Sequence, residues 1–246
     1  MDTIKLQKYF TDCGILSRRA AEEAIRRGEV RVNGEIATLG TRIDPMRDRV
    51  EYGKTSIRPT AVEKICILLN KPRGYVTTLS DERGRRTVAD LTANVGRRVY
   101  PVGRLDMDSD GLLLLTDDGA LANRLTHPKH EIPKIYHVTV KGAVEDEILA
   151  ALGQKMVLDG YTILPVKVRL RSFDRATGES VLEMRLLEGR NRQIRKMCAA
   201  VGLTITRLSR VAIGELTVDK LPSGKWRKLN ASELAYLRGE KQHLKK

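Results

Sequence analysis

The stretch that decides the fold is Gly103-Arg104-Leu105-Asp106-Met107-Asp108-Ser109-Asp110-Gly111-Leu112-Leu113-Leu114-Leu115. Three carboxylates alternate with other residues, an arginine precedes them, and a glycine closes each end. The unbroken run of leucines that follows is typical of a strand buried on both faces. The loop therefore leads into a core strand, which gives its polar side chains a rigid base.

Strand and helix patterns surround this stretch without a regular repeat. Strand patterns cover residues 65–70, 75–78, 99–102, 134–140, 166–170, 180–186 and 205–218. Helix patterns cover residues 120–125, 145–152, 192–201 and 232–238. Because helices are interspersed among antiparallel-looking strands and do not alternate with them regularly, we predict an α+β fold with a mainly antiparallel sheet.

The first part of the chain has the pattern of a small separate module. Ser17 is a good N-cap for a helix over residues 18–27. Val30–Val32 alternates as a strand, and Asn33-Gly34 is typical of a type I′ hairpin turn. We therefore expect this module to combine helices with a small sheet.

A stretch without periodicity, residues 53–63, follows the module and is interpreted as a linker. The chain has 246 residues, enough for one large domain or two ordinary ones. Its hydrophobic fraction of 41% is sufficient for a core, which excludes a disordered chain. We expect a small N-terminal domain at residues 1–60 and a larger domain at residues 61–246.

Composition also indicates the compartment. No apolar run is long enough to span a membrane, and the first residues lack the basic-then-apolar order of a secretory signal. Cys13, Cys66 and Cys198 lie among apolar neighbours, so we expect buried, reduced thiols in a cytoplasmic protein. His127 and His130 have no further ligand at metal-binding spacing, so no metal site is expected.

Net charge is the part of the composition that points to a partner. It is +14, with a sequence pI of about 9.9, and such a basic chain favours a polyanion whose counterions it displaces. Residues 1–60 have a net charge of +3, residues 61–184 of +1, residues 185–228 of +8 and residues 229–246 of +2. A generally basic exterior would spread its charge evenly, so the late concentration predicts a binding surface.

Calcium binding is one interpretation of the carboxylate loop. The spacing of Asp106, Asp108, Asp110 and Asp117 nearly matches an EF-hand loop. That loop requires a glutamate where Asp117 stands and a polar ligand where Leu114 stands, and it needs helices on both sides. Calcium binding is therefore disfavoured.

Two other interpretations of the loop remain. Glycine-bounded acidic segments are common turns, in which carboxylates accept hydrogen bonds from nearby amides, and Asp110 and Asp117 fit this role. The alternative is catalytic: on an extended backbone Arg104 and Asp106 share a face, while Leu105 anchors the loop in the core. A carboxylate near a guanidinium stays ionised at neutral pH and can act as nucleophile or base.

The second helix of the N-terminal module carries four arginines: Arg18, Arg19, Arg26 and Arg27. Salt-bridged helix surface explains them equally well on composition alone, because glutamates stand four residues away from two of them. However, the order helix, Ser-Arg-Arg-capped helix and Gly-x-Val-x-Val-Asn-Gly resembles the S4 RNA-binding domain. That resemblance implies that the four arginines lie near an RNA backbone, where contacts position RNA without reading its sequence.

A second resemblance covers most of the remaining chain. Gly103–Asp106, Gly111–Thr116 and Asp118-Gly119 are similar to the central motif of the pseudouridine synthases, in the ribosomal branch of the RsuA and RluB type. The other motifs of that family follow in order, as Leu69–Gly74, Lys134-x-Tyr136, Glu188–Met197 and Gly224–Leu229. Five motifs in order behind an S4-like module imply a pseudouridine synthase catalytic domain.

The resemblance implies a reaction and a role for particular residues. These enzymes isomerise a uridine within RNA: they break the glycosidic C–N bond, turn the base and rejoin it through C5, without cofactor or metal. By motif, Asp106 is the catalytic aspartate, Arg195 its salt-bridge partner, and Tyr136 stacks on the target base. Arg104 would enter the RNA helix in place of the flipped uridine, whose extrusion costs on the order of a few kcal/mol. Attack on the sugar, attack on the base and removal of a sugar proton all stay open for Asp106.

The late basic motif implies further RNA contacts from Arg190, Arg192 and Lys196, which have few acidic neighbours in sequence. Its Arg-Asn-Arg-Gln order is closer to large-subunit enzymes, so the implied substrate is 23S ribosomal RNA, free or in a pre-ribosomal particle, and the protein is expected to act as a monomer. The alternatives are a 16S enzyme and a non-catalytic RNA-binding assembly factor. A pure RNA binder has no need to keep Asp106, Tyr136 and Arg195 together, which disfavours the factor.

Overall fold

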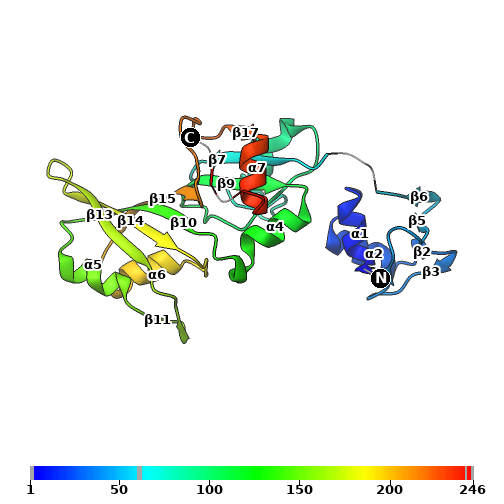
Figure 1. The fold of residues 1–246 in the computed structure, drawn as a ribbon, viewed down its shortest axis with the longest axis horizontal. Coiled ribbons are helices and arrows are strands. Elements are labelled where there is room, and N and C mark those ends of the chain that lie inside the picture. Colours follow the sequence, from blue (N-terminus) through cyan, green and yellow to red (C-terminus); the bar gives the residue numbers. More distant parts are fainter. Residues whose placement is uncertain (1–2, 60–62, 242, 245–246) are drawn as a thin grey trace. The chain divides into compact units, whose positions relative to one another are not determined.

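The computed structural model describes residues 3–59, 63–241 and 243–244. These residues fall into two units, and the chain up to Lys64 belongs to the first of them. Each unit has a hydrophobic core of its own. Figure 1 shows the helices and strands of both units, which are considered one at a time below.

The first unit packs two helices against small sheets. The helices are α1 (Leu6–Asp12) and α2 (Arg18–Arg26), and the strands are β1 (Ile4–Lys5), β2 (Val30–Val32), β3 (Glu35–Ile36), β4 (Arg42–Ile43), β5 (Val50–Tyr52) and β6 (Thr55–Ile57). The predicted cap is confirmed, because Ser17 Oγ accepts a hydrogen bond from the Ala20 amide. The predicted hairpin is confirmed as well: β2 pairs with β3 across Asn33 and Gly34, both in the left-handed region.

The prediction of a linker from residue 53 was wrong for Thr55–Ile57, which forms strand β6 beside β5. Two contacts hold this strand: Ile57 is buried in the core of the unit, and the Tyr9 hydroxyl donates a hydrogen bond to the Ile57 carbonyl at 3.0 Å. One apolar residue is too weak a signal to distinguish a short edge strand from a loop. Residues 60–62 of the predicted linker lie outside the described residues.

The second unit is built on one large sheet. Its strands are β7 (Cys66–Lys71), β8 (Tyr100–Pro101), β9 (Asp110–Thr116), β10 (Lys134–Lys141), β11 (Val157–Leu158), β12 (Tyr161–Thr162), β13 (Lys167–Asp174), β14 (Glu179–Leu186), β15 (Ile205–Ile213), β16 (Leu216–Thr217) and β17 (Trp226–Lys228). Its helices are α3 (Val88–Thr92), η1 (Ala93–Val95), α4 (Gly119–Thr126), η2 (Pro128–His130), α5 (Asp146–Gly153), α6 (Gln193–Ala200) and α7 (Ala231–Arg238). The α+β prediction is confirmed.

The large sheet has the strand order β13-β14-β10-β15-β9-β7-β17. Its pairings are antiparallel except between β15 and β9, which run parallel and meet at two residue pairs, Ser209↔Asp110 and Arg210↔Gly111. The Asp110 carboxylate reinforces this junction, because it accepts hydrogen bonds from Ser209 Oγ and, at 3.0 Å, from Arg207 Nε. We call the β15–β9 pairing the sheet junction.

Both faces of strand β9 are covered, as its four consecutive leucines predict. Leu112 and Leu114 belong to a core with residues of α4 and α7, and Leu113 and Leu115 belong to a core that includes Leu105. Figure 1 shows α4 and α7 beside β7 and β9, and α5 and α6 beside β10, β13 and β14. The loop that carries the carboxylates therefore starts and ends in packed structure.

The strand predicted at residues 75–78 was wrong, because only an isolated bridge between Val76 and Thr87 forms there. Thr77 instead uses its side chain to hold the carboxylate loop. Its hydroxyl donates to the Leu105 carbonyl at 2.6 Å and accepts from the Leu105 amide at 3.2 Å. The β-branched composition favoured a strand. Instead, the Thr77 side chain forms hydrogen bonds with the backbone of the carboxylate loop, and these bonds compete with strand pairing.

Candidate active site

Three anchors fix the backbone of the carboxylate loop. The Leu105 side chain is 6% exposed and lies in the core, while Thr77 binds its amide and carbonyl groups. The third anchor is Lys71, the last residue of β7, which is fully buried. Its ammonium group donates to the carbonyl oxygens of Pro72 at 3.0 Å, Asp106 at 3.1 Å and Ser109 at 2.8 Å. The loop is held through its backbone, which leaves its carboxylates available.

The charge of Lys71 is balanced by the loop that it holds. Burial lowers the pKa of Lys71 to about 8, while the carboxylates of Asp110, Asp106 and Asp108 oppose that decrease. At neutral pH the group therefore keeps the proton that its three hydrogen bonds require.

Two arginines at the start of α6 face the loop: Arg192 is its N-cap and Arg195 lies in its first turn. Arg192 Nη1 lies 3.3 Å from Asp106 Oδ2, and Arg195 Nε lies 3.8 Å from the same oxygen. Arg195 is closer to Asp108, at 3.0 Å between Nη2 and Oδ1, and it also donates to Ser109 Oγ at 3.2 Å. The salt bridge expected between Arg195 and Asp106 is thus present, but Arg192 makes the shorter contact.

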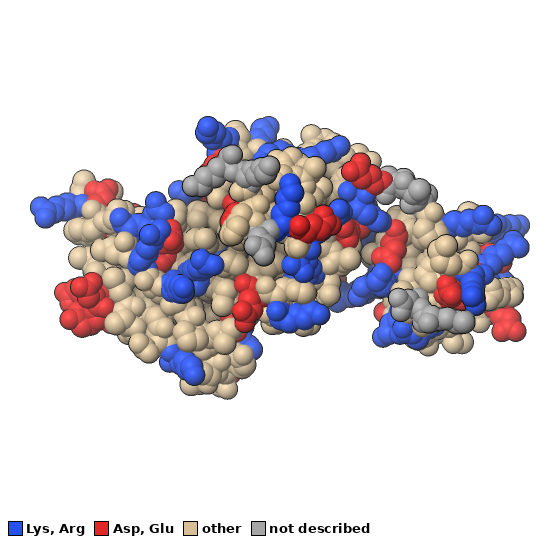
Figure 2. Space-filling model, in the orientation of Figure 1, with Lys and Arg blue, Asp and Glu red and all other residues tan. Residues whose placement is uncertain are grey.

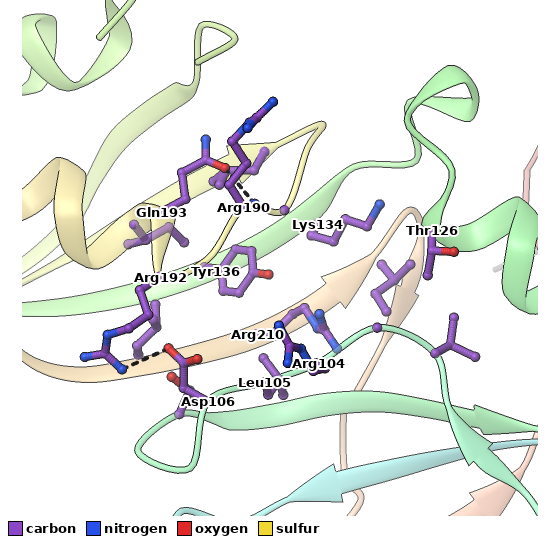
Figure 3. A pocket seen from close by; sticks show the side chains of 18 of the residues that line it. Arg104, Leu105, Asp106, Thr126, Lys134, Tyr136, Arg190, Arg192, Gln193 and Arg210 are labelled. Atoms are coloured by element: carbon purple, nitrogen blue, oxygen red, sulfur yellow. Dashed lines mark hydrogen bonds and ion pairs between the residues drawn. The ribbon is translucent and has the colours of Figure 1, made fainter. Parts of the chain in front are cut away.

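Arg192 has a left-handed backbone, with φ of 51° at the N-cap of α6. This conformation is uncommon for residues other than glycine and costs on the order of 1 kcal/mol. Figure 3 shows the Arg192 side chain directed at the Asp106 carboxylate. A strained backbone that aims a charged group at a carboxylate is typical of functional sites.

A cavity of about 230 Å³ opens beside Asp106. Tyr136, in strand β10, lines it together with the apolar side chains of Leu186, Ile194 and Leu208. Its charged lining residues are Arg104, Asp106, Lys134, Arg190, Arg192 and Arg210. Figure 3 shows the Tyr136 ring between Asp106 on one side and Lys134 on the other. An aromatic ring in an apolar pocket, within reach of a carboxylate, provides a surface on which a planar base can stack.

A second hollow adjoins the first at the carboxylate loop. Its lining includes Arg83, Arg85, Arg104, Asp106 and Asn191. Arg104 is exposed and borders both hollows, as a residue that enters RNA beside the pocket would. Arg85 forms an ion pair with Asp81. The hydrogen bonds that the Asp81 carboxylate accepts from the Arg85 side chain and from nearby backbone amides lower the pKa of Asp81 to about 2. The arginine-rich loop at residues 80–86 thus borders the candidate site.

The sequence interpretation assigned no role to two cations at the inner side of the pocket, Lys134 and Arg210. Arg210 is 4% exposed; its Nε donates to the Leu112 carbonyl at 2.7 Å, and its Nη2 has no hydrogen-bond partner. Burial, and the nearby charge of Arg210, lower the pKa of Lys134 to about 8. Among the described residues, neither side chain forms an ion pair. No local pattern marks either residue, because Lys134 begins its strand and Arg210 lies in a strand of mixed polarity.

Lys134→Met is expected to raise the melting temperature at pH 7, by roughly 2 °C or more. The pKa of Lys134 is 10.5 in the unfolded chain and about 8 in the folded one. Between these values the unfolded chain binds a proton that the folded chain lacks, so the cost of the buried charge is complete below pH 8 and disappears toward pH 10.5. Melting curves from pH 7 to pH 10.5 should therefore converge for wild type and variant.

Lys141, exposed at the far end of the same strand, provides the matched control. Lys141→Met should show no pH-dependent difference from wild type, because an exposed ammonium loses little hydration on folding. A lower melting temperature of Lys134→Met at pH 7, or a difference that persists at pH 10.5, would contradict the prediction.

Other predicted RNA-binding residues have protein partners. Arg190 lies over the Tyr161 ring, 2.9 Å from its centroid, and Lys196 forms an ion pair with Asp159. The expectation that this helix lacks acidic partners was wrong, because the hairpin of β11 and β12 brings Asp159 to it. Arg190 and Arg192 line the pocket, whereas Lys196 is not among its lining residues.

The four arginines that the S4-like resemblance places near RNA, Arg18, Arg19, Arg26 and Arg27, are all exposed. Arg26 pairs with Glu23 and Arg27 with Glu29, which are ordinary surface ion pairs. Within the part of the chain that the structure describes, Arg18 and Arg19 have no ion-pair partner. Helix α2 therefore presents two free guanidinium groups near its N-terminus.

Charge and metal-ligand geometry distinguish between polyanion and cation ligands. The face drawn in Figure 2 carries lysine and arginine side chains over both units, with acidic residues between them. Asp106 and Asp108 face arginines, and Asp110 binds Arg207 and Ser209, so these carboxylates do not converge on one point. No group of three or more metal-ligating side chains occurs among the described residues, and no described helix is long and apolar enough to cross a membrane.

Comparisons with known proteins agree with this geometry. Residues 65–200 match the family model of RNA pseudouridylate synthase, and residues 6–48 match that of the S4 domain. Ribosomal large subunit pseudouridine synthase B of Bacillus subtilis is 39% identical over 97% of this chain and 97% of its own length. The Salmonella typhimurium protein of the same name is 40% identical, over 96% and 82% of the two chains. A crystal structure of a pseudouridylate synthase superposes with a TM-score of 0.67 at 32% identity, over 95% of this chain and 99% of the other.

Proposed function

Since the chain belongs to the RNA pseudouridylate synthase family and carries an S4 domain, we propose that it isomerises a uridine of large-subunit (23S) ribosomal RNA to pseudouridine, with Asp106 as the catalytic carboxylate. Relatives named ribosomal large subunit pseudouridine synthase B, similar over nearly the whole chain, support the choice of RNA. We further propose residues 1–60 as the RNA-docking domain and residues 61–246 as the catalytic domain of a cytoplasmic monomer.

One observation carries the proposal: a carboxylate and an aromatic ring line the same pocket, and the loop beneath the carboxylate is fixed. Asp106 reaches the pocket from the loop, Tyr136 from β10, and the loop backbone is held by Lys71. A uridine flipped out of its helix would stack on Tyr136 with its sugar toward Asp106. Arg104, exposed at the rim, would occupy the position that the base vacates.

The reaction requires one bond to break and one to form. The glycosidic N1–C1′ bond breaks, the base turns, a C5–C1′ bond forms, and the hydrogen on C5 leaves as a proton while N1 gains one. Arg192 and Arg195, at 3.3 and 3.8 Å from Asp106, would hold the carboxylate oriented toward the sugar or base.

The wild-type protein is expected to release tritium from large-subunit ribosomal RNA labelled at uridine C5. Release follows from the chemistry, because the C5 proton exchanges with water only when C5 is joined to C1′. The measurement is tritium in the solvent after incubation with unmodified transcripts or pre-ribosomal particles. Small-subunit RNA is the parallel substrate: release from it alone would reassign the enzyme to 16S RNA, and no release from any of these RNAs would reject the catalytic proposal.

Arg18→Gln combined with Arg19→Gln is expected to weaken RNA binding. Each free guanidinium that neutralises a phosphate contributes about 1 to the slope of log affinity against log salt concentration. The double variant should therefore lose about 2 from that slope, measured by filter binding between low and moderate salt.

Arg47→Gln is the matched control for this pair. Arg47 is exposed, belongs to the same unit, and lies outside α2 in an ion pair with Asp44. Its replacement should leave the slope near the wild-type value. An unchanged slope in the double variant would mean that this end of α2 does not contact RNA.

A further inference from the structure

The inner side of the pocket holds positive charge that the protein does not neutralise. Arg210 is nearly fully buried with one free donor nitrogen, and Lys134 lies close enough for the two charges to repel. Neither forms an ion pair among the described residues. Burial of a charge without a partner is costly. Two unpaired cations are therefore expected where a bound ligand supplies the missing negative charge.

The sheet places both cations beside the aromatic ring. Arg210 stands directly opposite Tyr136 in the β10–β15 pairing, and Lys134 precedes Tyr136 by two residues on the same strand. All three line the cavity. Figure 3 shows Lys134 across the Tyr136 ring from Asp106. A base stacked on Tyr136 with its sugar toward Asp106 would thus have its far edge toward the two cations.

We propose that Lys134 and Arg210 bind the carbonyl oxygens of the flipped uracil and stabilise the negative charge that the ring acquires during the reaction. This inference rests on the proposed function, because it assumes that a uridine occupies the pocket. It assigns to Lys134, which belongs to the Lys134-x-Tyr136 motif, and to Arg210 a part in the chemistry that the sequence analysis gave to neither.

Negative charge reaches the ring by every route open to Asp106. If Asp106 attacks C1′ or removes a sugar proton, the electron pair of the N1–C1′ bond leaves with uracil, and the charge is shared over O2 and O4. If Asp106 adds to C6, the C5=C6 pair moves toward C4 and places the charge on O4. In each case the charge is lost when C5 joins C1′. The bond from Asp106 to C1′ or C6 breaks, or the sugar regains its proton from Asp106, so that the carboxylate is free again. C5 then releases its proton and N1 is protonated. Fixed cations at those oxygens lower the barrier because they are oriented before the charge develops.

The same two groups also select the base. Lysine and arginine only donate hydrogen bonds. They can therefore donate to the O4 oxygen of uracil, whereas the amino group of cytosine is itself a donor and would be left without an acceptor. Sites that leave a buried polar group unpaired discriminate strongly between such analogues. A pocket with two donor-only cations should therefore exclude cytidine.

The test measures rate and binding separately, on full-length protein and large-subunit ribosomal RNA labelled with tritium at uridine C5. Lys134→Met is expected to lower the rate of tritium release at saturating protein by roughly 10²-fold, while the dissociation constant for RNA changes by less than about threefold. Lys134→Arg, which keeps the charge and the donors, should recover most of that loss. Lys141→Met, exposed on the same strand, should retain the wild-type rate.

Arg210→Met should lose rate in the same way, and Lys134→Met keeps the proposal testable if the buried Arg210 variant fails to fold. A proportional loss of RNA affinity with an unchanged saturating rate would overturn the proposal, because the cations would then hold a phosphodiester. A folded Lys134→Met with wild-type rate and affinity would overturn it too, and so would failure of Lys134→Arg to recover activity. Tritium release by the wild type in the same assay separates these results from failure of the proposed function. If the wild type released no tritium, both the proposed function and this proposal would be rejected.

Discussion

Asp106→Asn is expected to lower tritium release from large-subunit ribosomal RNA by roughly 10³-fold or more. Asparagine has the shape of aspartate but is neither a nucleophile nor a base. The loop should stay in place, because Leu105, Thr77 and Lys71 hold it through backbone groups rather than through the carboxylate. RNA affinity and its salt dependence should be close to those of the wild type, since neither depends on this negative charge.

Asp108→Asn is the matched control. Asp108 faces the same two arginines, at 3.0 Å from Arg195 and 3.6 Å from Arg192, and it is exposed to a similar degree as Asp106. If Asp106 alone reacts, Asp108→Asn should cost about tenfold or less, through loss of one anchor for the arginines. Equal losses of tritium release in Asp106→Asn and Asp108→Asn would mean that the two carboxylates act only through the negative charge of the loop. Asp106 would then not be the reacting group.

Gly111→Ala is expected to destabilise the protein by about 3 kcal/mol or more and to abolish activity. Gly111 pairs with Arg210 at the sheet junction, with φ of 105°. A Cβ atom there would lie 2.9 Å from the Arg210 nitrogen and overlap its carbonyl oxygen, so backbone would have to move against backbone. The displaced strand would carry Asp106 away from the pocket.

Gly142→Ala separates the clash from the cost of the left-handed backbone. Gly142 also has a positive φ, of 87°, but a Cβ atom there meets nothing within 4 Å. This control should lose only about 1–2 kcal/mol. Chemical denaturation of the three proteins measures both effects, and equal stabilities of the two variants would show that the close approach at Gly111 can relax.

The elements around the candidate site were predictable where the signal was local. Four leucines predicted a strand buried on both faces, and Ser17 predicted the start of α2; both depend on neighbours along the chain. The resemblance to known motifs also drew attention to Asp106, Tyr136 and Arg195. In the structure, Asp106 and Tyr136 line one pocket and Arg195 contacts Asp106.

The remaining features depend on contacts between distant parts of the chain. The Arg210 side chain binds the carbonyl of a residue 98 positions earlier, and the Lys71 ammonium binds that of a residue 38 positions later. Pattern analysis treats a lysine or arginine as exposed, so it has no means of identifying one that is buried by a remote loop. For the same reason, it missed the ion pair of Lys196 with Asp159.

The sheet junction between β9 and β15 has a mechanical consequence. Two residue pairs join the strands there, together with side-chain hydrogen bonds of Asp110 and Arg210, whereas the strands on either side pair over longer stretches. The pocket straddles this narrow line, because Asp106 comes from the β9 side and Tyr136 from the β10 side. A hinge rotation of one half of the sheet against the other changes the separation of carboxylate and ring directly. Under the proposed function, we expect the width of the pocket to depend on any load that bound RNA places across the two halves of the sheet.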